Sequence, residues 1–418
     1  METITVKAQN RNFNTEIILP ASKSISNRLL IIRALSHEYF GIDNLSKAND
    51  TKLIHQLLEQ IKNIDSSNLI NNIDCQDAGT VFRFLTALLA SVPGKHILNG
   101  SARMQERPIG ILVDALRMLG AKIEYINNEG FPPLKIEGQK LQSKEIEIQS
   151  DVSSQFISAL LMIAPNLPQG LQLHLQQKPA SVAYIDMTIN LLRYFEISVN
   201  YNDSHITVAH GAYESKNITI ETDWSAAAFW YQAVAFSENG KLLLKGVSLS
   251  SIQGDAVLPK IYKHLGVETL ETENGVIIQK NGNIENNFNW DFSNYPDLAL
   301  PVIATCAGLG VIGKFSGLES LKIKESNRVQ ALMAELTKLG FDFREVDSHE
   351  WVLINSCKIE ASDFDFSEII IETHNDHRVA MNFAPFAILG KGIQIENPDV
   401  VKKSYPDFWT EFNKLCSI

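Results

Sequence analysis

Six segments of the chain share one pattern, a short turn of polar or small residues followed at once by a helix rich in Ala, Leu and Phe. Apolar residues recur at helical spacing in each segment, behind a turn of the kind that starts a helix. The segments begin at Leu19, Asp77, Ser153, Asp223, Tyr295 and Asn375. Further amphipathic helices lie between them, and several end at a Gly that a strand follows directly, as at Gly120, Gly266 and Gly340. Six units in 418 residues leave about 70 residues each, too many for a solenoid repeat.

This repetition predicts an α/β (α+β) fold of six β-α-β-α-β-β repeats, arranged three per lobe in two lobes. Helix–strand alternation is common to α/β proteins, so a less regular α/β architecture stays open at this point. Each turn presents unpaired backbone N–H groups at a helix start, which favour an anion. If three such helix starts in each lobe converge, the chain has a cleft that attracts anions.

Composition and charge argue against several classes of protein. The net charge of −11 disfavours nucleic acid or an anionic membrane as the main partner. Residues 1–14 contain no apolar core of a signal peptide, and the longest uncharged stretch, 298–313, is too short and broken to span a bilayer. Four cysteines without paired spacing indicate reduced thiols in a cytoplasmic protein rather than disulfides or a zinc site: Cys75, Cys306, Cys357 and Cys416.

Basic residues stand at the junctions between turns and helices. With Ser22 as N-cap, Lys23, Ser24 and Arg28 lie in the first turn and a half of a helix, where cations oppose the dipole unless an anion binds. Arg107 precedes Pro108, the expected first turn of another helix. Seven cations share this placement: Lys23, Arg28, Arg107, Lys324, Arg328, Arg378 and Lys403.

Arg binds carboxylate and phosphate through a planar fork, and Lys binds them as a point charge. Seven such cations predict ligands with on the order of five or six negative charges, since each sheltered charge-assisted bond contributes roughly 1.5–3 kcal/mol. For each cation taken alone, there is an alternative to anion binding: a solvated helix start, a surface loop or a salt bridge with Glu325.

Motifs of nucleotide chemistry are missing from the sequence. It contains no Walker phosphate loop, no dinucleotide fingerprint, no kinase signature and no nucleophile elbow. Phosphoryl transfer from a nucleotide and hydride transfer are therefore disfavoured. His374 and His377 suggest a metal, but no third ligand with metal spacing accompanies them. We expect neither a metal nor another cofactor.

In their order along the chain, the motifs resemble the enolpyruvyl transferase family, and within it the 5-enolpyruvylshikimate-3-phosphate synthases (3-phosphoshikimate 1-carboxyvinyltransferases). The resemblance runs from Leu19 to Phe408. It is carried by Ser-Lys-Ser-Ile-Ser-Asn-Arg at 22–28, Asp-Ala-Gly-Thr-Val-Phe-Arg at 77–83, Arg-Met-Gln-Glu-Arg-Pro-Ile-Gly at 103–110, Ser-Ser-Gln-Phe at 153–156, Pro-Asp at 296–297, Lys-Glu-Ser-Asn-Arg at 324–328, Asn-Asp-His-Arg at 375–378 and Lys-Ser-Tyr-Pro-Asp-Phe at 403–408.

The resemblance implies two lobes of three repeats, lobe 1 from residues 1–19 and 223–418 and lobe 2 from residues 20–222. It implies transfer of the enolpyruvyl group of phosphoenolpyruvate to the 5-hydroxyl of shikimate 3-phosphate, with release of phosphate, by addition–elimination through a tetrahedral intermediate. This is a step of chorismate and aromatic amino acid biosynthesis. The expected partners are these two small molecules, without nucleic acid or membrane, and the expected state is a cytoplasmic monomer.

The resemblance also assigns residues. Shikimate 3-phosphate is assigned to Lys23, Ser24, Arg28, Ser153, Ser154, Gln155, Ser181, Tyr184, Asp297 and Lys324. Phosphoenolpyruvate is assigned to Lys23, Gly79, Arg107, Gln155, Arg328, Arg378 and Lys403. The catalytic candidates are Asp297 as general base and Glu325 as proton donor to the methylene carbon, with Lys23 and His377 as electrostatic or proton-relay partners.

Some positions depart from the family pattern: Ala21 for Gly, Asn327 for Asp, Trp224 beside Asp223, Ser320, and no Pro before Tyr184. The nearest alternative is a UDP-N-acetylglucosamine enolpyruvyl transferase. That enzyme generally carries Cys in the loop equivalent to residues 101–110, where this chain has none. A non-catalytic binder of phosphorylated metabolites is the other alternative, but binding alone does not require Asp297 and Glu325 beside seven cations.

Overall fold

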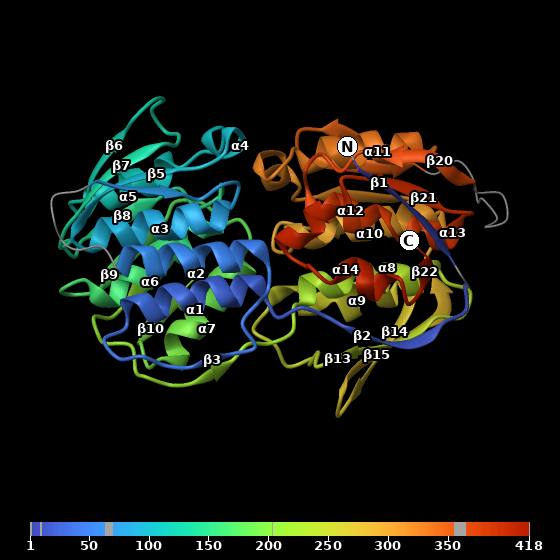
Figure 1. Ribbon diagram of the computed structural model, residues 1–418, viewed down its shortest axis with the longest axis horizontal. Helices are drawn as coiled ribbons and strands as arrows, with labels where there is room; N and C mark the ends of the chain where they lie inside the picture. The colour runs from blue at the N-terminus through green and yellow to red at the C-terminus, as the bar shows by residue number, and fades with distance from the viewer. Residues whose placement is uncertain (1, 9–10, 63–69, 203, 355–364, 418) are drawn as a thin grey trace. The chain divides into compact units, whose positions relative to one another are not determined.

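The computed structural model divides the chain into two compact units (Figure 1). It describes residues 2–8, 11–62, 70–202, 204–354 and 365–417. Unit 1 comprises Met1–Ser22, Lys47–Asn49 and Glu221–Ile418, and unit 2 comprises Lys23–Ser46 and Asp50–Ile220. The proposed lobe boundaries, at 19/20 and 222/223, lie within three residues of the divisions between units at 22/23 and 220/221.

Unit 2 alternates short strands with helices. Its helices are α1 (Lys23–Leu35), α2 (Asn49–Lys62, whose first residue clusters with unit 1), α3 (Gly79–Ser91), α4 (Ala102–Gln105), α5 (Gly110–Met118), α6 (Ser154–Ile163), η1 (Ala164–Asn166) and α7 (Val182–Tyr194). Its strands are β3 (Ile42–Asp43), β4 (Ile70–Asp74), β5 (Gly94–Asn99), β6 (Lys122–Tyr125), β7 (Leu134–Gly138), β8 (Glu145–Ile148), β9 (Leu171–Leu175), β10 (Val199–Asn202), β11 (His205–Val208) and β12 (Ile218–Thr219).

Unit 1 takes strands from both ends of the chain. Its strands are β1 (Thr3–Ala8), β2 (Asn14–Ile18), β13 (Lys241–Lys245), β14 (Leu265–Thr272), β15 (Gly275–Ile284), β16 (Trp290–Asp291), β17 (Gly313–Ser316), β18 (Asp342–Asp347), β19 (Glu350–Ile354), β20 (Phe366–Ile371), β21 (Ile393–Glu396) and β22 (Cys416–Ser417). Its helices are α8 (Trp224–Phe236), η2 (Gly254–Val257), α9 (Leu258–Lys263), η3 (Pro296–Leu298), α10 (Ala299–Leu309), η4 (Glu319–Ile323), α11 (Arg328–Lys338), α12 (His377–Phe383), α13 (Phe386–Leu389), η6 (Pro398–Lys403) and α14 (Phe408–Phe412).

Five four-stranded sheets have the same topology. In each, the first two strands are parallel and the next two pairings are antiparallel, as in the order β4-β5-β7-β6. The others are β8-β9-β11-β10, β2-β13-β15-β14, β16-β17-β19-β18 and β20-β21-β1-β22. The sixth sheet has only the parallel pair β3–β12 among the described residues, so the sixth repeat is reduced.

The N-terminal strands complete two sheets of unit 1. Strand β2 pairs in parallel with β13, Asn14 opposite Lys241 through Ile18 opposite Lys245. Strand β1 lies between β21 and β22, antiparallel to both. The start of the chain is therefore part of unit 1, because β1 and β2 each supply one strand of a four-stranded sheet whose other strands come from the second half of the chain.

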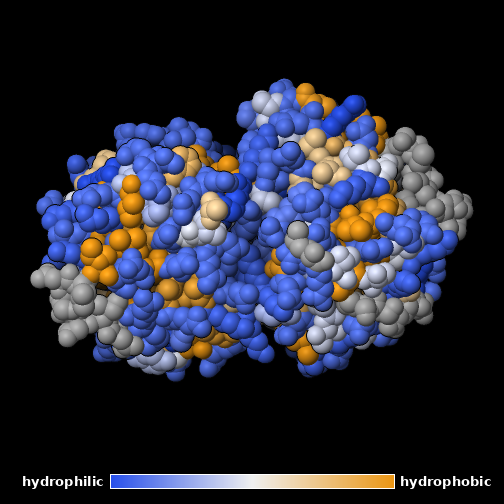
Figure 2. All heavy atoms as spheres, turned by 45° about the horizontal axis from the view of Figure 1, so that its top comes forward, coloured by the Kyte–Doolittle hydropathy of each residue, from blue (hydrophilic) through white to orange (hydrophobic). Residues whose placement is uncertain are grey.

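The most apolar helices lie inside the units. Every residue of α8 except Ser225 is buried, and α10 is buried from Ala299 to Ala307. A helix that is hydrophobic all round belongs in a core, and α8 packs against α10 accordingly. On the face in Figure 2, hydrophilic residues predominate and hydrophobic ones form separate patches. Within the described part of the chain, no helix has both the length and the apolar character to cross a membrane.

Glycine ends two of the predicted helices as expected. Gly120 and Gly340 follow α5 and α11 with φ of +94° and +87°, a conformation that favours Gly, and β6 and β18 begin two residues later. At Gly266 the prediction was wrong, since β14 already starts at Leu265 and includes this glycine. The prediction that Pro108 lies in the first turn of a helix was also wrong, because α5 begins at Gly110.

Candidate active site

Side-chain caps start several of the helices that carry predicted site residues. The Ser153 hydroxyl accepts from the backbone N–H of Gln155, and Asp376 caps α12 by accepting from Arg378 N at 2.9 Å. Asn327 caps α11 by accepting from the N–H of Gln330 at 3.2 Å. Asn and Asp are equally good caps, so this departure from the family pattern keeps the helix start.

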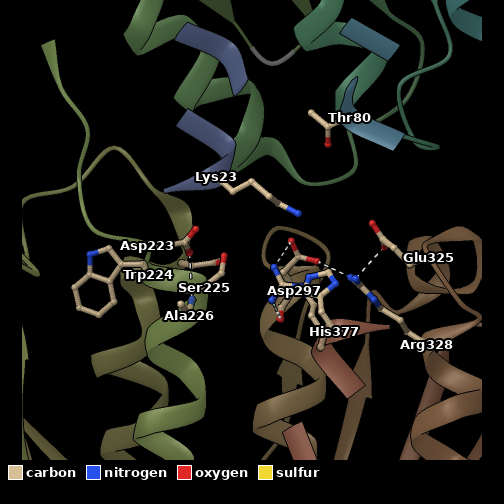
Figure 3. A network of polar contacts seen from close by, with 12 residues as sticks. Lys23, Thr80, Asp223, Trp224, Ser225, Ala226, Asp297, Glu325, Arg328 and His377 are labelled. Carbon is tan, nitrogen blue, oxygen red and sulfur yellow. Dashed lines mark hydrogen bonds and ion pairs between the residues drawn. The ribbon is translucent and has the colours of Figure 1, made fainter. Parts of the chain in front are cut away.

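Arg328 is the centre of a buried charge cluster in unit 1 (Figure 3). Its side chain is 3% exposed and contacts three carboxylates. Nε donates to Asp376 at 2.7 Å, Nη1 to Asp297 at 3.0 Å and Nη2 to Glu325 at 2.9 Å. Arg328, the first residue of α11, thus forms ion pairs with residues of three segments: η3, the loop before α11 and the N-cap of α12.

The charge of Arg328 is strongly stabilised. Burial alone lowers the pKa of a guanidinium, but the carboxylates of Asp376, Glu325 and Asp297 outweigh it and raise the pKa of Arg328 above its ordinary value. Arg328 is therefore a permanent cation among three anions. An anionic substrate that binds Arg328 therefore competes with these carboxylates for its guanidinium.

Asp297 is held by two arginines. Oδ1 accepts from Arg328, and Oδ2 lies 3.0 Å from Nη2 of Arg378. Arg378 also donates through Nη1 to the Asp297 backbone carbonyl at 3.2 Å. Two cations predicted to bind phosphoenolpyruvate and the predicted general base therefore form one ion-pair network.

Three further predicted residues of unit 1 are His377 and Lys324, which are sequence neighbours of residues in this network, and Lys403. His377, the first residue of α12, is buried with Nδ1 3.5 Å from Oδ1 of Asp376. Lys324 follows η4 directly and is half-buried, and Lys403, the last residue of η6, is buried. Asn375 has a positive φ of +54° just before the cap, a strained conformation of the kind found at functional sites.

The sequence search for metal ligands missed one group in unit 1. Ligand atoms of Glu335, Glu372 and His374 lie within 4.8 Å of one another, so His374 does have further possible ligands nearby. Glu335 comes from α11, and Glu372 and His374 come from the segment before α12, so the sequence does not place the three side by side. Both oxygens of buried Glu335 are engaged, one by Lys338 and His374 and the other by Lys338 and the Glu372 N–H. Ion pairing accounts for this group.

Arg28 is a buried cation of unit 2. It is 2% exposed and donates only to neutral oxygens: Thr188 Oγ1 at 2.7 Å, Ser24 O at 3.0 Å, Ser158 Oγ at 3.1 Å and Tyr184 O at 3.3 Å. Among the described residues, no carboxylate lies within ion-pair distance of it. Burial lowers the pKa of Arg28 to about 10. A buried guanidinium without an anion favours an anionic ligand nearby.

Gly79 and Arg107, both assigned to phosphoenolpyruvate, are in contact. A Cβ added to Gly79 would lie 2.4 Å from Nη1 of Arg107, so the buried guanidinium packs directly on the glycine backbone. Helix α3 begins there without a side-chain cap. A cation beside an uncapped helix N-terminus forms an environment that stabilises a phosphate or carboxylate.

Arg83 holds this arrangement in place. Its Nη1 donates to the Gly79 carbonyl at 3.0 Å and its Nη2 to the Pro108 carbonyl at 3.1 Å. One side chain therefore ties the first turn of α3 to the loop that carries Arg107. Arg83 belongs to the 77–83 motif but was not assigned a role, because its partners are backbone atoms that a sequence does not reveal.

The remaining predicted residues of unit 2 lie at helix starts. Lys23 forms an ion pair of 3.0 Å with buried Asp50 of α2, and Gln155 donates to Thr80 of α3 at 3.0 Å. Ser154 begins α6, and Ser181 precedes α7 with a positive φ of +56°. The Tyr184 ring centroid lies 5.8 Å from Cζ of Arg28.

Sequence reasoning missed the side chains that contact the predicted site residues: Asp50, Thr80, Arg83, Ser158, Thr188 and Asp376. Ser158 and Thr188 carried a usable signal, since each places a hydroxyl on an otherwise apolar helix face. Trp224 instead has a structural role, as it is buried and donates through Nε1 to the Ser248 carbonyl at 3.0 Å.

Known proteins resemble this chain over nearly its whole length. The model of the EPSP synthase family (3-phosphoshikimate 1-carboxyvinyltransferase) matches residues 7–412. A 3-phosphoshikimate 1-carboxyvinyltransferase of Bacteroides fragilis (strain YCH46) is 46% identical over 400 residues, which are 95% of this chain and 94% of that protein. One of Pseudoalteromonas translucida (strain TAC 125) is 33% identical over 442 aligned positions, gaps included, which cover all of both chains.

The fold agrees with this relationship. A solved structure of EPSP synthase from Acinetobacter baumannii superposes with a TM-score of 0.79 at 21% identity and covers 99% of this chain and 98% of that one. The fold of two units with repeated α/β topology is therefore the fold of that protein, as predicted. The chain belongs to the EPSP synthase family.

Proposed function

We propose that this chain transfers the enolpyruvyl group of phosphoenolpyruvate to the 5-hydroxyl of shikimate 3-phosphate, the activity that names its family, and that it does so with the residues described above. The observation that carries the assignment of roles is the network in which Asp297 lies between Arg328 and Arg378. This network combines a base with the cations that a donor with two anionic groups, a phosphate and a carboxylate, requires.

The cations of unit 2 supply binding. Arg28, with no carboxylate partner among the described residues, is suited to an anionic group of shikimate 3-phosphate. Tyr184 is next to Arg28 and is suited to pack on the ring. Arg107 beside the uncapped start of α3 is suited to phosphoenolpyruvate, since a guanidinium and a helix N-terminus each favour an anion.

Binding of phosphoenolpyruvate prepares the base. Its carboxylate and phosphate are the groups that Arg forks bind, so they compete with Asp297 for Arg328 and Arg378. Once an arginine is taken by the substrate, an oxygen of Asp297 is available to the 5-hydroxyl. The arrangement thereby couples donor binding to activation of the acceptor.

The reaction then proceeds in two balanced steps. Asp297 takes the hydroxyl proton as the oxygen bonds to C2 of phosphoenolpyruvate. Glu325, which takes up a proton once the donor draws Arg328 away from it, gives that proton to C3, and the tetrahedral intermediate forms. In the second step Glu325 takes a proton back from C3 as the C2–O bond to phosphate breaks, which restores the double bond, and Asp297 returns its proton to the departing phosphate. Lys23 and His377 assist as electrostatic or relay groups, and no cofactor is needed because no P–O bond breaks.

The test is phosphate release by the purified chain. Phosphate is expected only when phosphoenolpyruvate and shikimate 3-phosphate are both present. Release with UDP-N-acetylglucosamine instead would establish the alternative transferase, and binding of both substrates without release would establish a non-catalytic binder.

The variant Asp297→Asn tests the base. Its kcat is expected to fall about 10²- to 10⁴-fold, the usual contribution of a general base, with the circular dichroism spectrum retained. Asp291→Asn is the matched control, since Asp291 is an exposed aspartate that accepts hydrogen bonds from Ser293 in the same unit. Equal kcat values for the two variants would remove Asp297 from the mechanism.

We further propose that the chain works in the cytoplasm as a monomer. The described cysteines Cys75, Cys306 and Cys416 are buried free thiols, which suits a reducing compartment; Cys357 lies outside the described residues. Light scattering during size exclusion is expected to give the mass of one chain.

A further inference from the structure

Two buried hydroxyl groups hold the Arg28 guanidinium in unit 2. Thr188 lies on α7 and Ser158 on α6, and both residues are 0% exposed. Arg28 Nε donates to Thr188 Oγ1 at 2.7 Å, and Nη2 donates to Ser158 Oγ at 3.1 Å. Helices α1, α6 and α7 pack against one another (Figure 1). Arg28 of α1 is therefore fixed by hydrogen bonds to two helices other than its own.

The two hydroxyl groups also bond to each other and to the backbone. Thr188 Oγ1 lies 2.9 Å from Ser158 Oγ and 2.9 Å from the Tyr184 carbonyl, one helical turn earlier. An Arg N–H can only donate, whereas a hydroxyl group has one hydrogen and two acceptor lone pairs. Both hydroxyl oxygens therefore accept from Arg28, and the Thr188 hydrogen is left for the Tyr184 carbonyl or for Ser158.

The hydrogen bonds of Arg28 leave one N–H group for a ligand. A guanidinium has one hydrogen on Nε and two on each Nη. Thr188 takes the hydrogen of Nε, while Ser158 and the Tyr184 carbonyl take those of Nη2. The Ser24 carbonyl takes one hydrogen of Nη1 at 3.0 Å. Among the described residues, none accepts the second hydrogen of Nη1, the nitrogen that contacts the first turn of α1.

Two aromatic rings lie beside the same guanidinium. Cζ of Arg28 is 5.4 Å from the ring centroid of Phe84 and 5.8 Å from that of Tyr184. A cation is attracted to the face of an aromatic ring, but this attraction leaves the guanidinium able to turn in its own plane. Hydrogen bonds depend strongly on angle, so the bonds to Thr188 and Ser158 set that rotation.

We propose that Thr188 and Ser158 are positioning residues that turn Arg28 so that its remaining N–H, on Nη1, meets an anionic group of shikimate 3-phosphate. The proposal rests on the function proposed above. Arg often binds a carboxylate or phosphate through two parallel N–H bonds. Because the protein occupies Nε and Nη2, Arg28 contributes its charge and a single directed bond. Affinity for the acceptor thus depends on two neutral residues that contact Arg28 rather than the acceptor.

The experiment replaces Thr188 by Val, which keeps the shape of the side chain and removes the acceptor of Nε. KM for shikimate 3-phosphate is expected to rise at least about fivefold, the smallest effect usual for a buried donor that loses its acceptor. KM for phosphoenolpyruvate is expected to change little. Thr188→Ser returns the hydroxyl group and is expected to restore KM to within about twofold of the wild type.

Thr86→Val is the matched control. Thr86 is also 0% exposed, lies in the same unit on α3, and donates to the carbonyl one turn earlier, that of Phe82, at 2.8 Å. Within the described part of the chain, its hydroxyl group has no hydrogen bond with a cation. The control therefore loses the same bond within a helix without disturbing Arg28, and its KM for shikimate 3-phosphate is expected to equal that of the wild type.

Ser158→Ala tests the proposal from α6, and it serves if Thr188→Val does not fold. It removes an acceptor of Nη2 and is expected to raise the same KM selectively. A double-mutant cycle completes the test. In a chain that already carries Arg28→Met there is no guanidinium to position, so Thr188→Val is expected to raise KM for shikimate 3-phosphate no further.

An unchanged or lower KM in both Thr188→Val and Ser158→Ala would overturn the proposal, because the hydroxyl groups would then only compensate a buried charge or compete with the substrate. Equal KM values in Thr188→Val and Thr188→Ser, or additive effects in the cycle, would overturn it as well. The Kd of shikimate 3-phosphate, measured by titration calorimetry, gives the same comparison without turnover. Absence of phosphate release by the wild type would instead refute the proposed function, so the two failures are distinguishable.

Discussion

Replacing Gly79 by Ala tests whether Arg107 and the start of α3 form one anion site. The added Cβ would lie 2.4, 2.6 and 2.7 Å from Nη1, Cζ and Nη2 of Arg107. Ordinary contact begins near 3.4 Å, so the guanidinium has to move by about 1 Å, enough to break a charge-assisted hydrogen bond. Such a bond contributes roughly 1.5–3 kcal/mol, and its loss corresponds to an increase of about 10- to 150-fold in KM for phosphoenolpyruvate.

The assay is steady-state phosphate release with phosphoenolpyruvate varied at saturating shikimate 3-phosphate. It is repeated with shikimate 3-phosphate varied at saturating phosphoenolpyruvate. KM for shikimate 3-phosphate is expected to change little. Gly110→Ala is the control, because its Cβ would make only ordinary contacts, 3.4 Å from Gly130 Cα and 3.7 Å from the Tyr125 hydroxyl. It introduces the same methyl group at the start of α5.

A double-mutant cycle decides between two mechanisms. If Gly79→Ala acts by displacing Arg107, it is expected to raise KM for phosphoenolpyruvate little further in a chain that already carries Arg107→Ala. If the two effects on KM simply add, the methyl group obstructs the ligand directly, and the reasoning from the Arg107 contact is refuted.

Three further predictions concern buried charges. Arg28→Met removes a cation whose burial costs on the order of 3 kcal/mol, so Tm is expected to stay equal or rise while KM for shikimate 3-phosphate increases at least about tenfold. A lower Tm or an unchanged KM would contradict this. Asp376→Asn keeps the cap of α12 but removes one of the three carboxylate charges paired with Arg328. The free energy of unfolding in urea is expected to fall by about 1–3 kcal/mol, and an unchanged denaturation midpoint would disprove this. The folded-state pKa of Asp255, about 7, lies above the unfolded value of 3.8, so the native state binds the extra proton between these pH values and loses stability as pH rises. Asp255→Asn is therefore expected to be more stable than the wild type at pH 8, by on the order of 4 kcal/mol, with the difference vanishing toward pH 4; a constant difference would refute the assignment.

Helix starts could be predicted because capping is local. Ser153, Asp223 and Asn327 stand within three residues of the N–H groups that they accept from. The number of repeats, six, was harder to predict from the sequence. Five sheets share one topology, but the sixth keeps only β3 and β12, two residues each, too short for strand periodicity to be seen.

The partners of the predicted cations were beyond sequence reasoning. Arg28 bonds to Thr188, 160 positions away, and Arg328 to Asp376, 48 positions away. No local pattern links such residues, because the packing of apolar helix faces decides which of them meet.

By itself, the amino-acid sequence determined the family and the kinds of charged group at the helix starts, since both depend on residue identity and short-range order. Only the tertiary structure decided that Asp297 lies between two arginines, that Arg28 has no carboxylate partner among the described residues, and that Arg107 rests on Gly79. The physical reason is that the sign of a charge belongs to the residue, whereas its energy depends on distance and burial, which the folded core sets.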